Sequence, residues 1–241
     1  MTDKHLSSQF DSELNAVSSR LMAFGGLVET QIRDALKALA QFSVSAADSV
    51  IAAGDAVNAM EIEIDHALSS IIARRQPAAR DLRLLIVISK TTANLERAGD
   101  EAEKIARMVK SIVAAHAAAT LPAANLAVAA ELAATSLRKS LDCLARLDIK
   151  AAVNILRDDA KIDHEFARFI EIMVTNMMAD PKNVAPGLDL VFIAKAIERI
   201  GDHAKNIAEF TIYLAAGQDI RHAPVEDIES TLQDTDKAPI S

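Results

Sequence analysis

Eight carboxylate side chains are the residues of this sequence best suited to chemistry, because they form four pairs with one spacing. The members of each pair are four positions apart, and the pairs are Glu61 with Asp65, Glu96 with Asp100, Asp159 with Asp163, and Glu198 with Asp202. On a helix this spacing places both side chains on one face, where like charges repel. Four such pairs predict a compensating cation, and oxygen ligands suit hard metal ions such as Mg²⁺, Mn²⁺, Ca²⁺ or iron. We expect Mg, Mn or Fe, with Zn as a further candidate.

The carboxylate pairs belong to an internal duplication. Segments 96–102 and 198–204 both read Glu-Arg-x-Gly-Asp-x-Ala and are 102 positions apart. Asp65 and Asp163 are 98 positions apart, so a small insertion distinguishes the two halves. Each half has the size of a small domain. The sequence therefore predicts two copies of one unit.

Apolar residues at alternating spacings of three and four predict a long bundled helix in each half. The apolar seam runs through 88–112 in the first half and through 190–214 in the second. At 100° per residue, the carboxylates on these helices point well away from the seam. We therefore expect them to face outward, where an acidic pair is often only a solvated helix face.

Two other residue types repeat inside the signature. Gly99 and Gly201 stand between the carboxylates, although glycine within a helix costs about 1 kcal/mol relative to alanine. Either a neighbouring helix or a ligand that approaches the backbone explains them. Arg97 and Arg199 follow the Glu of each pair and are candidates for holding the metal-binding carboxylates or for binding an anion. Ordinary surface arginines are the alternative.

Composition favours an all-α protein of two tandem three-helix bundles. Hydrophobic residues make up 51% of the chain and aromatic residues only 3%, so the core must consist of Ala, Leu, Ile, Val and Met, which are mostly good helix formers. We predict a first repeat over 1–118, a second over 119–217 and an acidic, disordered tail over 218–241. The predicted helices that precede the two seams are 10–42, 46–75, 122–147 and 148–178. Prolines at 77, 122, 181 and 186 mark the predicted joints.

Charge and cysteine content narrow the function further. The net charge of −8 argues against nucleic-acid binding, because phosphates require a basic surface. Cys143 is the single cysteine and is expected to be a small core residue. Segment 111–134 is half alanine and carries Pro122 and Glu131, so it makes a poor membrane span and should contain a turn. With no leader at the start of the sequence, we expect a cytoplasmic protein.

Two longer strings carry a resemblance to a known family. Segment 75–83 reads Arg-Gln-Pro-Ala-Ala-Arg-Asp-Leu-Arg, and segment 198–209 reads Glu-Arg-Ile-Gly-Asp-His-Ala-Lys-Asn-Ile-Ala-Glu. Both resemble signatures of the PhoU family of bacterial phosphate-signalling proteins, and the resemblance extends over 10–216. It implies two three-helix bundles, each with acidic metal-binding motifs.

The resemblance to the PhoU family also implies a regulatory adaptor and no enzyme. Members of that family restrain the phosphate-starvation response by linking the high-affinity phosphate transporter to a sensor histidine kinase. They are typically homodimeric and cytoplasmic, and they reach the inner membrane through their partners. The first half departs from the pattern at Lys104 and Arg107, which stand where the second half has Asn206 and Glu209. We expect these cations to make the first metal site weaker or smaller.

Two other functions are weaker interpretations. A ferritin-like metal enzyme or storage bundle would use Glu-x-x-His motifs that face a four-helix core, and only Glu63 with His66 has this spacing. A phosphoester hydrolase at a multinuclear metal site lacks a convincing nucleophile or base. His66, His164 and His203 each follow an acidic residue, but surface histidines are common, so we leave them out of the predicted sites.

Overall fold

The computed structural model describes residues 2–217, with side chains from Ser8 onward, and this part of the chain is helical without any strand. The predicted acidic tail lies outside the described residues. The helices are α1 (Thr2–Gln41), α2 (Val44–Arg75), α3 (Ala79–Ala114), α4 (Ala127–Arg146), α5 (Ile149–Ala179) and α6 (Val184–Ala216), with short 3-10 turns η1 (Ala123–Leu126) and η2 (Pro181–Asn183). The predicted all-α class is confirmed.

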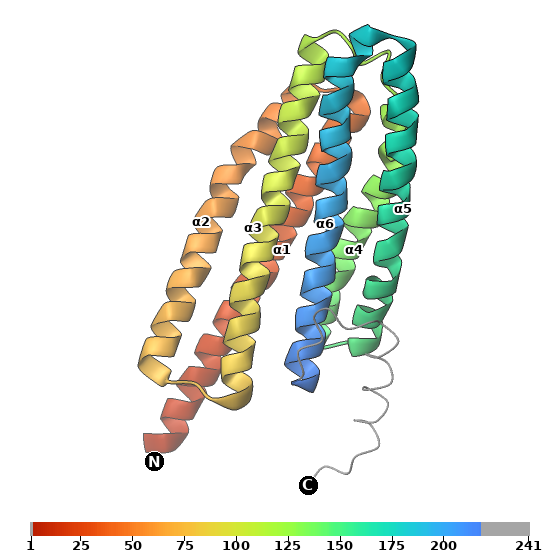
Figure 1. The fold of residues 1–241 in the computed structure, drawn as a ribbon. Coiled ribbons are helices and arrows are strands. Elements are labelled where there is room, and N and C mark those ends of the chain that lie inside the picture. Colours follow the sequence, from red (N-terminus) through yellow and green to blue (C-terminus); the bar gives the residue numbers. More distant parts are fainter. Residues whose placement is uncertain (1, 218–241) are drawn as a thin grey trace.

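The helices form two three-helix halves, as predicted. Helices α1, α2 and α3 pack on one another, as do α4, α5 and α6, and the halves meet mainly where α3 packs against α6. Figure 1 shows α2, α3, α6 and α5 side by side, with α1 and α4 behind them. The chain ascends through α3 and descends through α6 in this view, so these two central helices are antiparallel.

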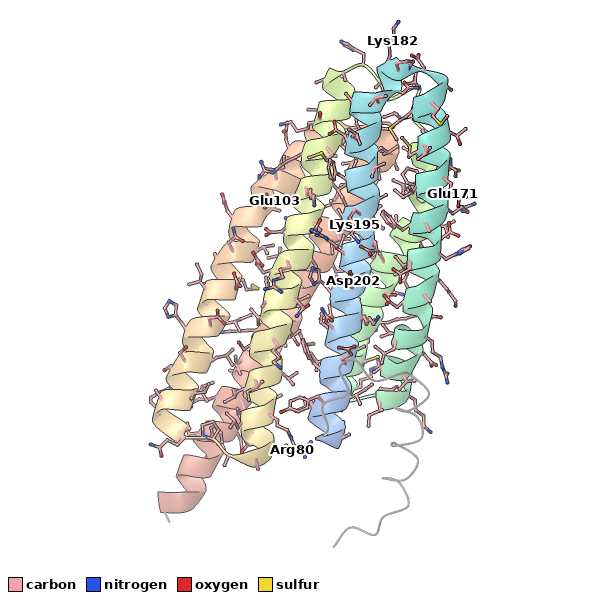
Figure 2. All side chains as sticks on the ribbon, viewed as in Figure 1. Arg80, Glu103, Glu171, Lys182, Lys195 and Asp202 are labelled. Atoms are coloured by element: carbon pink, nitrogen blue, oxygen red, sulfur yellow. The ribbon has the colours of Figure 1, made fainter. Side chains whose placement is uncertain are left out.

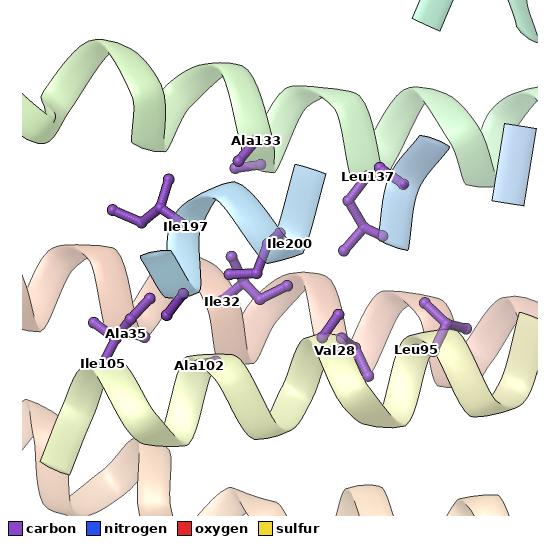
Figure 3. Close-up of a cluster of buried hydrophobic side chains, with 14 of the residues drawn as sticks. Val28, Ile32, Ala35, Leu95, Ala102, Ile105, Ala133, Leu137, Ile197 and Ile200 are labelled. Carbon is purple, nitrogen blue, oxygen red and sulfur yellow. The ribbon is translucent and has the colours of Figure 1, made fainter. Parts of the chain in front are cut away.

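The core follows the predicted seams. Every seam position of α3 and α6 is buried, from Ile88 to Ile112 and from Leu190 to Leu214. Figure 3 shows Val28 and Ile32 packed among buried side chains of α3, α4 and α6. One large apolar cluster draws residues from all six helices of the described chain. Cys143 is buried as a member of a smaller apolar cluster, as expected.

Side-chain caps fix the start of the second helix in each half. The Ser43 hydroxyl accepts a hydrogen bond from the Ala46 amide at 3.2 Å, and the Asp148 carboxylate accepts one from the Ala151 amide at 3.0 Å. These caps satisfy amides that a helix terminus would otherwise leave unpaired. The predicted bounds of α2 and α5 are correspondingly close to the observed ones.

Two predicted features of the helices differ in the structure. Helix α1 begins at Thr2 and not near position 10. The helix is continuous through Gly25, where the side chain of Leu141 on α4 packs against the glycine. Pro186 does not mark a joint, because it lies in the first turn of α6, where the missing amide hydrogen has no helical partner in any case. No helix in the described range has the length and apolar character needed to cross a membrane.

Candidate metal centres

The first carboxylate cluster lies between α2 and α3. Burial raises the pKa of Glu96 to about 7, and the nearby charges of Asp100 and Glu61 add to the increase. Burial also raises the pKa of Glu61, followed by the charges of Asp65 and Asp100. These mutual effects require that the two pairs face each other. Helices α2 and α3 therefore bring their carboxylate pairs close to each other.

The second cluster repeats this arrangement between α5 and α6. Burial raises the pKa of Asp202 to about 6, with further contributions from Glu198, Asp159 and Asp163. The pKa of Asp163 is raised for the same reasons, burial first and then the charge of Asp159. Asp159 itself is only 6% exposed. Figure 2 labels Asp202 on α6.

The expectation that the carboxylates face outward is only half right. They point away from the α3–α6 seam, but the second helix of each half packs on that side, so Glu96, Glu198 and Asp202 are partly covered. Asp65, Asp100 and Asp163 remain exposed. Each cluster is therefore partly covered where its two helices touch, and its exposed carboxylates remain open to solvent.

The two mid-helix glycines are explained by close helix packing. A Cβ atom on Gly201 would lie 2.7 Å from Cδ1 of Ile162 on α5. A Cβ atom on Gly99 would lie 2.9 Å from Oε1 of Gln31 and 3.2 Å from Cγ1 of Val57. Because the space beside both glycines is filled by neighbouring side chains, the packing interpretation replaces the approach of a ligand.

Two lysines that sequence reasoning missed enter the second cluster. Lys205 Nζ lies 2.7 Å from Oδ2 of Asp159, and Lys195 Nζ lies 2.7 Å from the Glu198 carboxylate. Their signal was present in the sequence, since each stands three positions from a predicted ligand and thus on the same helix face. The matching positions in the first half carry Ala93 and Glu103, so the first cluster receives no such lysine.

The expected cations of the first cluster lie elsewhere. Lys104 Nζ pairs with Glu101 at 3.3 Å, and Arg107 Nη2 pairs with Glu103 at 2.8 Å. Within the described chain, no lysine or arginine forms an ion pair with the four carboxylates of the first cluster. Lys104 and Arg107 therefore do not pair with the carboxylates of the first cluster, whereas Lys195 and Lys205 pair with those of the second.

The donor set suits a hard cation, although the ligands are not yet gathered around one point. Each cluster offers only carboxylate oxygens, and the pKa values of Glu96 and Asp202 are raised first by burial and then by neighbouring negative charge, which a bound cation would offset. In the part of the chain that is described, no three Asp, Glu, His or Cys side chains already stand as ligands of one ion.

A third polar feature, the central groove, lies between α3 and α6. It has a volume of about 390 Å³ and is lined by Arg97, Asp100, Glu101, Arg199, Asp202, His203 and Asn206. Arg199 Nη1 lies 3.0 Å from Oε1 of Glu101. Arg199 thus pairs across the two halves, whereas the charge of Arg97 lowers the pKa values of Glu61 and Glu96.

The three histidines have different surroundings. His66 and His164 are exposed. His203 is partly buried in the central groove, with Nδ1 3.0 Å from Oδ1 of Asn94. Burial lowers the pKa of His203, and the positive charge of Arg97 lowers it further. None of them contributes to either carboxylate cluster as described, although His203 belongs to the groove between the clusters.

Tandem three-helix bundles, each with facing carboxylates between its second and third helices, define the structural class of this protein. Residues 21–109 and 126–211 match the family model described as the PhoU domain, and the chain belongs to the PhoU family. It is similar to a Burkholderia "phosphate-specific transport system accessory protein PhoU homolog", with 45% identity over 95% of this chain and 97% of the relative. The Escherichia coli K12 accessory protein PhoU is 40% identical over 98% of both chains.

Solved structures of the family have the same fold. The crystal structure of PhoU from Pseudomonas aeruginosa matches with a TM-score of 0.82 and 38% identity, over 87% of this chain and all of that one. The phosphate transport system regulatory protein PhoU from Streptococcus pneumoniae matches with a TM-score of 0.77 and 26% identity, over 87% of this chain and 98% of the other.

The fold does not favour the ferritin-like alternative. In that class the ligands project into the core shared by four helices. Here the carboxylates lie between two helices on the side opposite the buried seam, and Glu63 and His66 are both exposed. The buried seam positions are apolar apart from Thr91 and Thr211.

Proposed function

We propose that this protein is a metal-binding regulatory adaptor of phosphate transport that represses the phosphate-starvation response. The observation that carries the proposal is the convergence of two carboxylate pairs in each half of a PhoU-family chain. The names of its relatives, which describe accessory proteins of a phosphate-specific transport system, supply the process. In this role it couples the high-affinity transporter to a sensor histidine kinase, and it needs binding surfaces and no catalytic group.

Each metal centre would use the four carboxylates of its own half. The first would be held by Glu61, Asp65, Glu96 and Asp100, and the second by Asp159, Asp163, Glu198 and Asp202. Mg, Mn or Fe suits these oxygen ligands, with Zn as a further candidate. Bound metal would offset the repulsion within each cluster and fasten α2 to α3 and α5 to α6. Arg97 and Arg199 stand beside the clusters and would adjust their charge or bind an anion.

The first centre should bind metal more tightly than the second. In the second cluster a cation must displace the ammonium groups of Lys195 and Lys205, which lie 2.7 Å from its carboxylates. In the first cluster no comparable ion pair has to be broken. This order is the reverse of the one expected from the sequence.

The adaptor would use the face on which α2, α3, α6 and α5 lie side by side (Figure 1). Both carboxylate clusters and the central groove belong to these four helices. Metal occupancy would therefore change the charge of one continuous surface, where a transporter subunit or a kinase could read it. We further propose a homodimer that resides in the cytoplasm and meets the inner membrane only through these partners.

Calorimetric titration with Mn²⁺ tests the metal centres. We expect binding to wild type, loss of the tighter site in Glu96→Gln/Asp100→Asn, and loss of the weaker one in Glu198→Gln/Asp202→Asn. Glu63→Gln is the matched control, because Glu63 lies between Glu61 and Asp65 in sequence but is exposed outside the cluster. Helical content measured by circular dichroism must stay constant. Wild type that binds no Mn²⁺, Mg²⁺ or iron would refute the metal-binding part.

The regulatory part is tested in a bacterium that lacks its own PhoU protein. Wild type should silence a reporter driven by a phosphate-starvation promoter when phosphate is abundant. The two double variants should repress it less, whereas Glu63→Gln should repress it fully. Equal repression by all variants would separate regulation from metal binding, and no repression by wild type would contradict the adaptor role.

A further inference from the structure

The duplication of the chain should place two identical ion pairs across the central groove. Arg97 corresponds to Arg199 at the offset of 102 positions, and Glu101 corresponds to position 203. Because α3 and α6 are antiparallel, an exact duplication would pair each arginine with the glutamate of the opposite helix. The Arg199–Glu101 pair exists, with a distance of 3.0 Å. Its counterpart does not, because position 203 is a histidine.

This replacement leaves Arg97 without an anionic partner on the opposite helix. Arg97 is exposed and lines the groove, and it makes no hydrogen bond or ion pair with any residue of the described chain. Glu101, which is four positions from Arg97 and on the same helix face, already receives Arg199 and Lys104. The guanidinium of Arg97 therefore lacks the carboxylate partner that its symmetric equivalent, Arg199, has in Glu101.

The hydrogen bonds around His203 define what its ring can offer. Asn94 Nδ2 donates to the carbonyl of Lys90 at 2.8 Å, which makes Oδ1 of Asn94 the acceptor for its other contacts. Asn206 Nδ2 donates to this oxygen at 3.0 Å, and His203 Nδ1 lies at the same distance from it. Nδ1 must therefore carry the proton. Nε2 of the neutral ring keeps a lone pair and accepts a hydrogen bond.

We propose that the central groove binds inorganic phosphate in the place of the missing carboxylate. The Arg97 guanidinium supplies the charge-assisted donors that match an oxyanion. His203 accepts the hydrogen bond from the protonated oxygen that phosphate carries near neutral pH. This inference rests on the proposed function, since it names the small molecule that the same surface would sense.

The acidic residues in the groove couple this site to the metal centres. Asp100 and Asp202 line the groove and also belong to the first and second carboxylate clusters. While the clusters are empty, their charge repels an anion, and a bound cation removes part of that repulsion. Phosphate affinity should therefore rise when metal binds, and phosphate should strengthen metal binding by the same factor.

Equilibrium dialysis of radiolabelled phosphate against the full-length protein tests the proposal, with Mg²⁺ present and after chelation. We expect one saturable phosphate per chain and a higher affinity with Mg²⁺. Arg97→Gln should weaken binding by about 10- to 100-fold, the usual effect of losing a hydrogen bond to a charged group. His203→Glu should abolish binding, because it supplies Arg97 with the carboxylate that Glu101 gives Arg199. Arg33→Gln is the control, since Arg33 pairs with Glu29 on α1 away from the groove.

Competition with sulfate examines the role of His203. Sulfate has the shape of phosphate but no proton at neutral pH, so it cannot donate to Nε2 and should compete about tenfold more weakly, as expected for one lost hydrogen bond. Equal competition would overturn the assignment to His203.

The results that overturn the site are distinct from those that overturn the proposed function. Absent phosphate binding in samples that demonstrably bind Mg²⁺ refutes the groove site and leaves the adaptor intact. Phosphate binding that survives both Arg97→Gln and His203→Glu also refutes it, because the ion would then bind elsewhere. Samples that bind no metal contradict the proposed metal centres instead. In that case the effect of Arg97→Gln on phosphate binding is still measured on the chelated protein.

Discussion

At the residue scale, the two strongly perturbed carboxyl groups lie in different halves and share one cause. Glu96 and Asp202 are both partly covered by a neighbouring helix and both face other carboxylates, which raises their pKa values to about 7 and about 6. Raising the pKa favours the neutral form, so protons and metal ions compete for these oxygens. Metal affinity and stability should therefore both depend on pH near neutrality.

The free energy of unfolding of the metal-free protein should fall as pH rises toward 8. A carboxyl whose folded pKa exceeds its ordinary value of 4.5 stabilises the fold below pH 4.5, and that contribution is lost as pH rises through about 7. Glutamine cannot ionise, so Glu96→Gln avoids the cost of charging this side chain at high pH. It should raise the free energy of unfolding at pH 8 by about 1 kcal/mol, allowing for solvent screening. Urea denaturation in chelator between pH 5 and 8 measures it. Glu63→Gln should leave the pH profile unchanged, and an unchanged profile in Glu96→Gln would contradict the prediction.

Residue spacing along one helix made the carboxylate pairs predictable. The same spacing could not predict contacts between residues of the two halves. The i, i+4 rule assigns Glu198 and Asp202 to one face, and the related i, i+3 spacing would also have assigned Lys195 and Lys205 to that face. The Arg199–Glu101 pair joins residues 98 positions apart and depends on how α3 lies against α6. No local pattern reports that placement, so the role of His203 in the groove was not predictable.

At the element scale, glycines in helix interiors should respond to substitution according to their neighbours. Gly26 on α1 is exposed, and a Cβ there would meet nothing within 4 Å, so Gly26→Ala should stabilise the protein by about 0.5–1 kcal/mol through helix propensity alone. Gly201→Val should destabilise it by about 1–3 kcal/mol, because the added side chain must displace Ile162. Thermal unfolding of both variants measures the contrast. Equal effects at the two positions would mean that close packing of α5 on α6 does not require the glycine.

The N-cap of α5 provides a second test at this scale. Asp148→Ala removes the acceptor for the Ala151 amide and should lower the free energy of unfolding by about 1 kcal/mol. Asp148→Asn keeps a side-chain oxygen at the cap and should lose only a small part of that amount. Urea denaturation of both variants distinguishes the cap from a general effect of charge, which would make Asn as damaging as Ala.

Periodicity predicted the long helices well because each buries one apolar stripe. The seams at 88–112 and 190–214 are buried at every seam position. Helix ends were less predictable. The polar start of α1 has little apolar pattern, yet it is helical from Thr2, and Pro186 was read as a break although the first turn of α6 accommodates it.

At the scale of the whole molecule, the duplication and the core point to different units of folding. The repeated motif predicts two domains, 1–118 and 119–217. The large apolar cluster nevertheless includes Leu95 on α3 and Ile197 on α6, both fully buried, together with residues of the other four helices. Separating the halves would expose the most apolar faces of both central helices to water.

The protein should therefore unfold in one cooperative transition, although its sequence contains two repeats. Leu95→Ala in the first half and Ile197→Ala in the second should each lower the stability of both halves by about 2–5 kcal/mol, the usual cost of truncating a buried Leu or Ile. Hydrogen exchange followed by mass spectrometry measures each half separately, and calorimetry compares the calorimetric and van't Hoff enthalpies. Leu188→Ala is the control, because Leu188 on α6 is 46% exposed. If either buried substitution accelerated exchange only in its own half, the repeats would be independent domains and the shared α3–α6 core would be a docking contact between them.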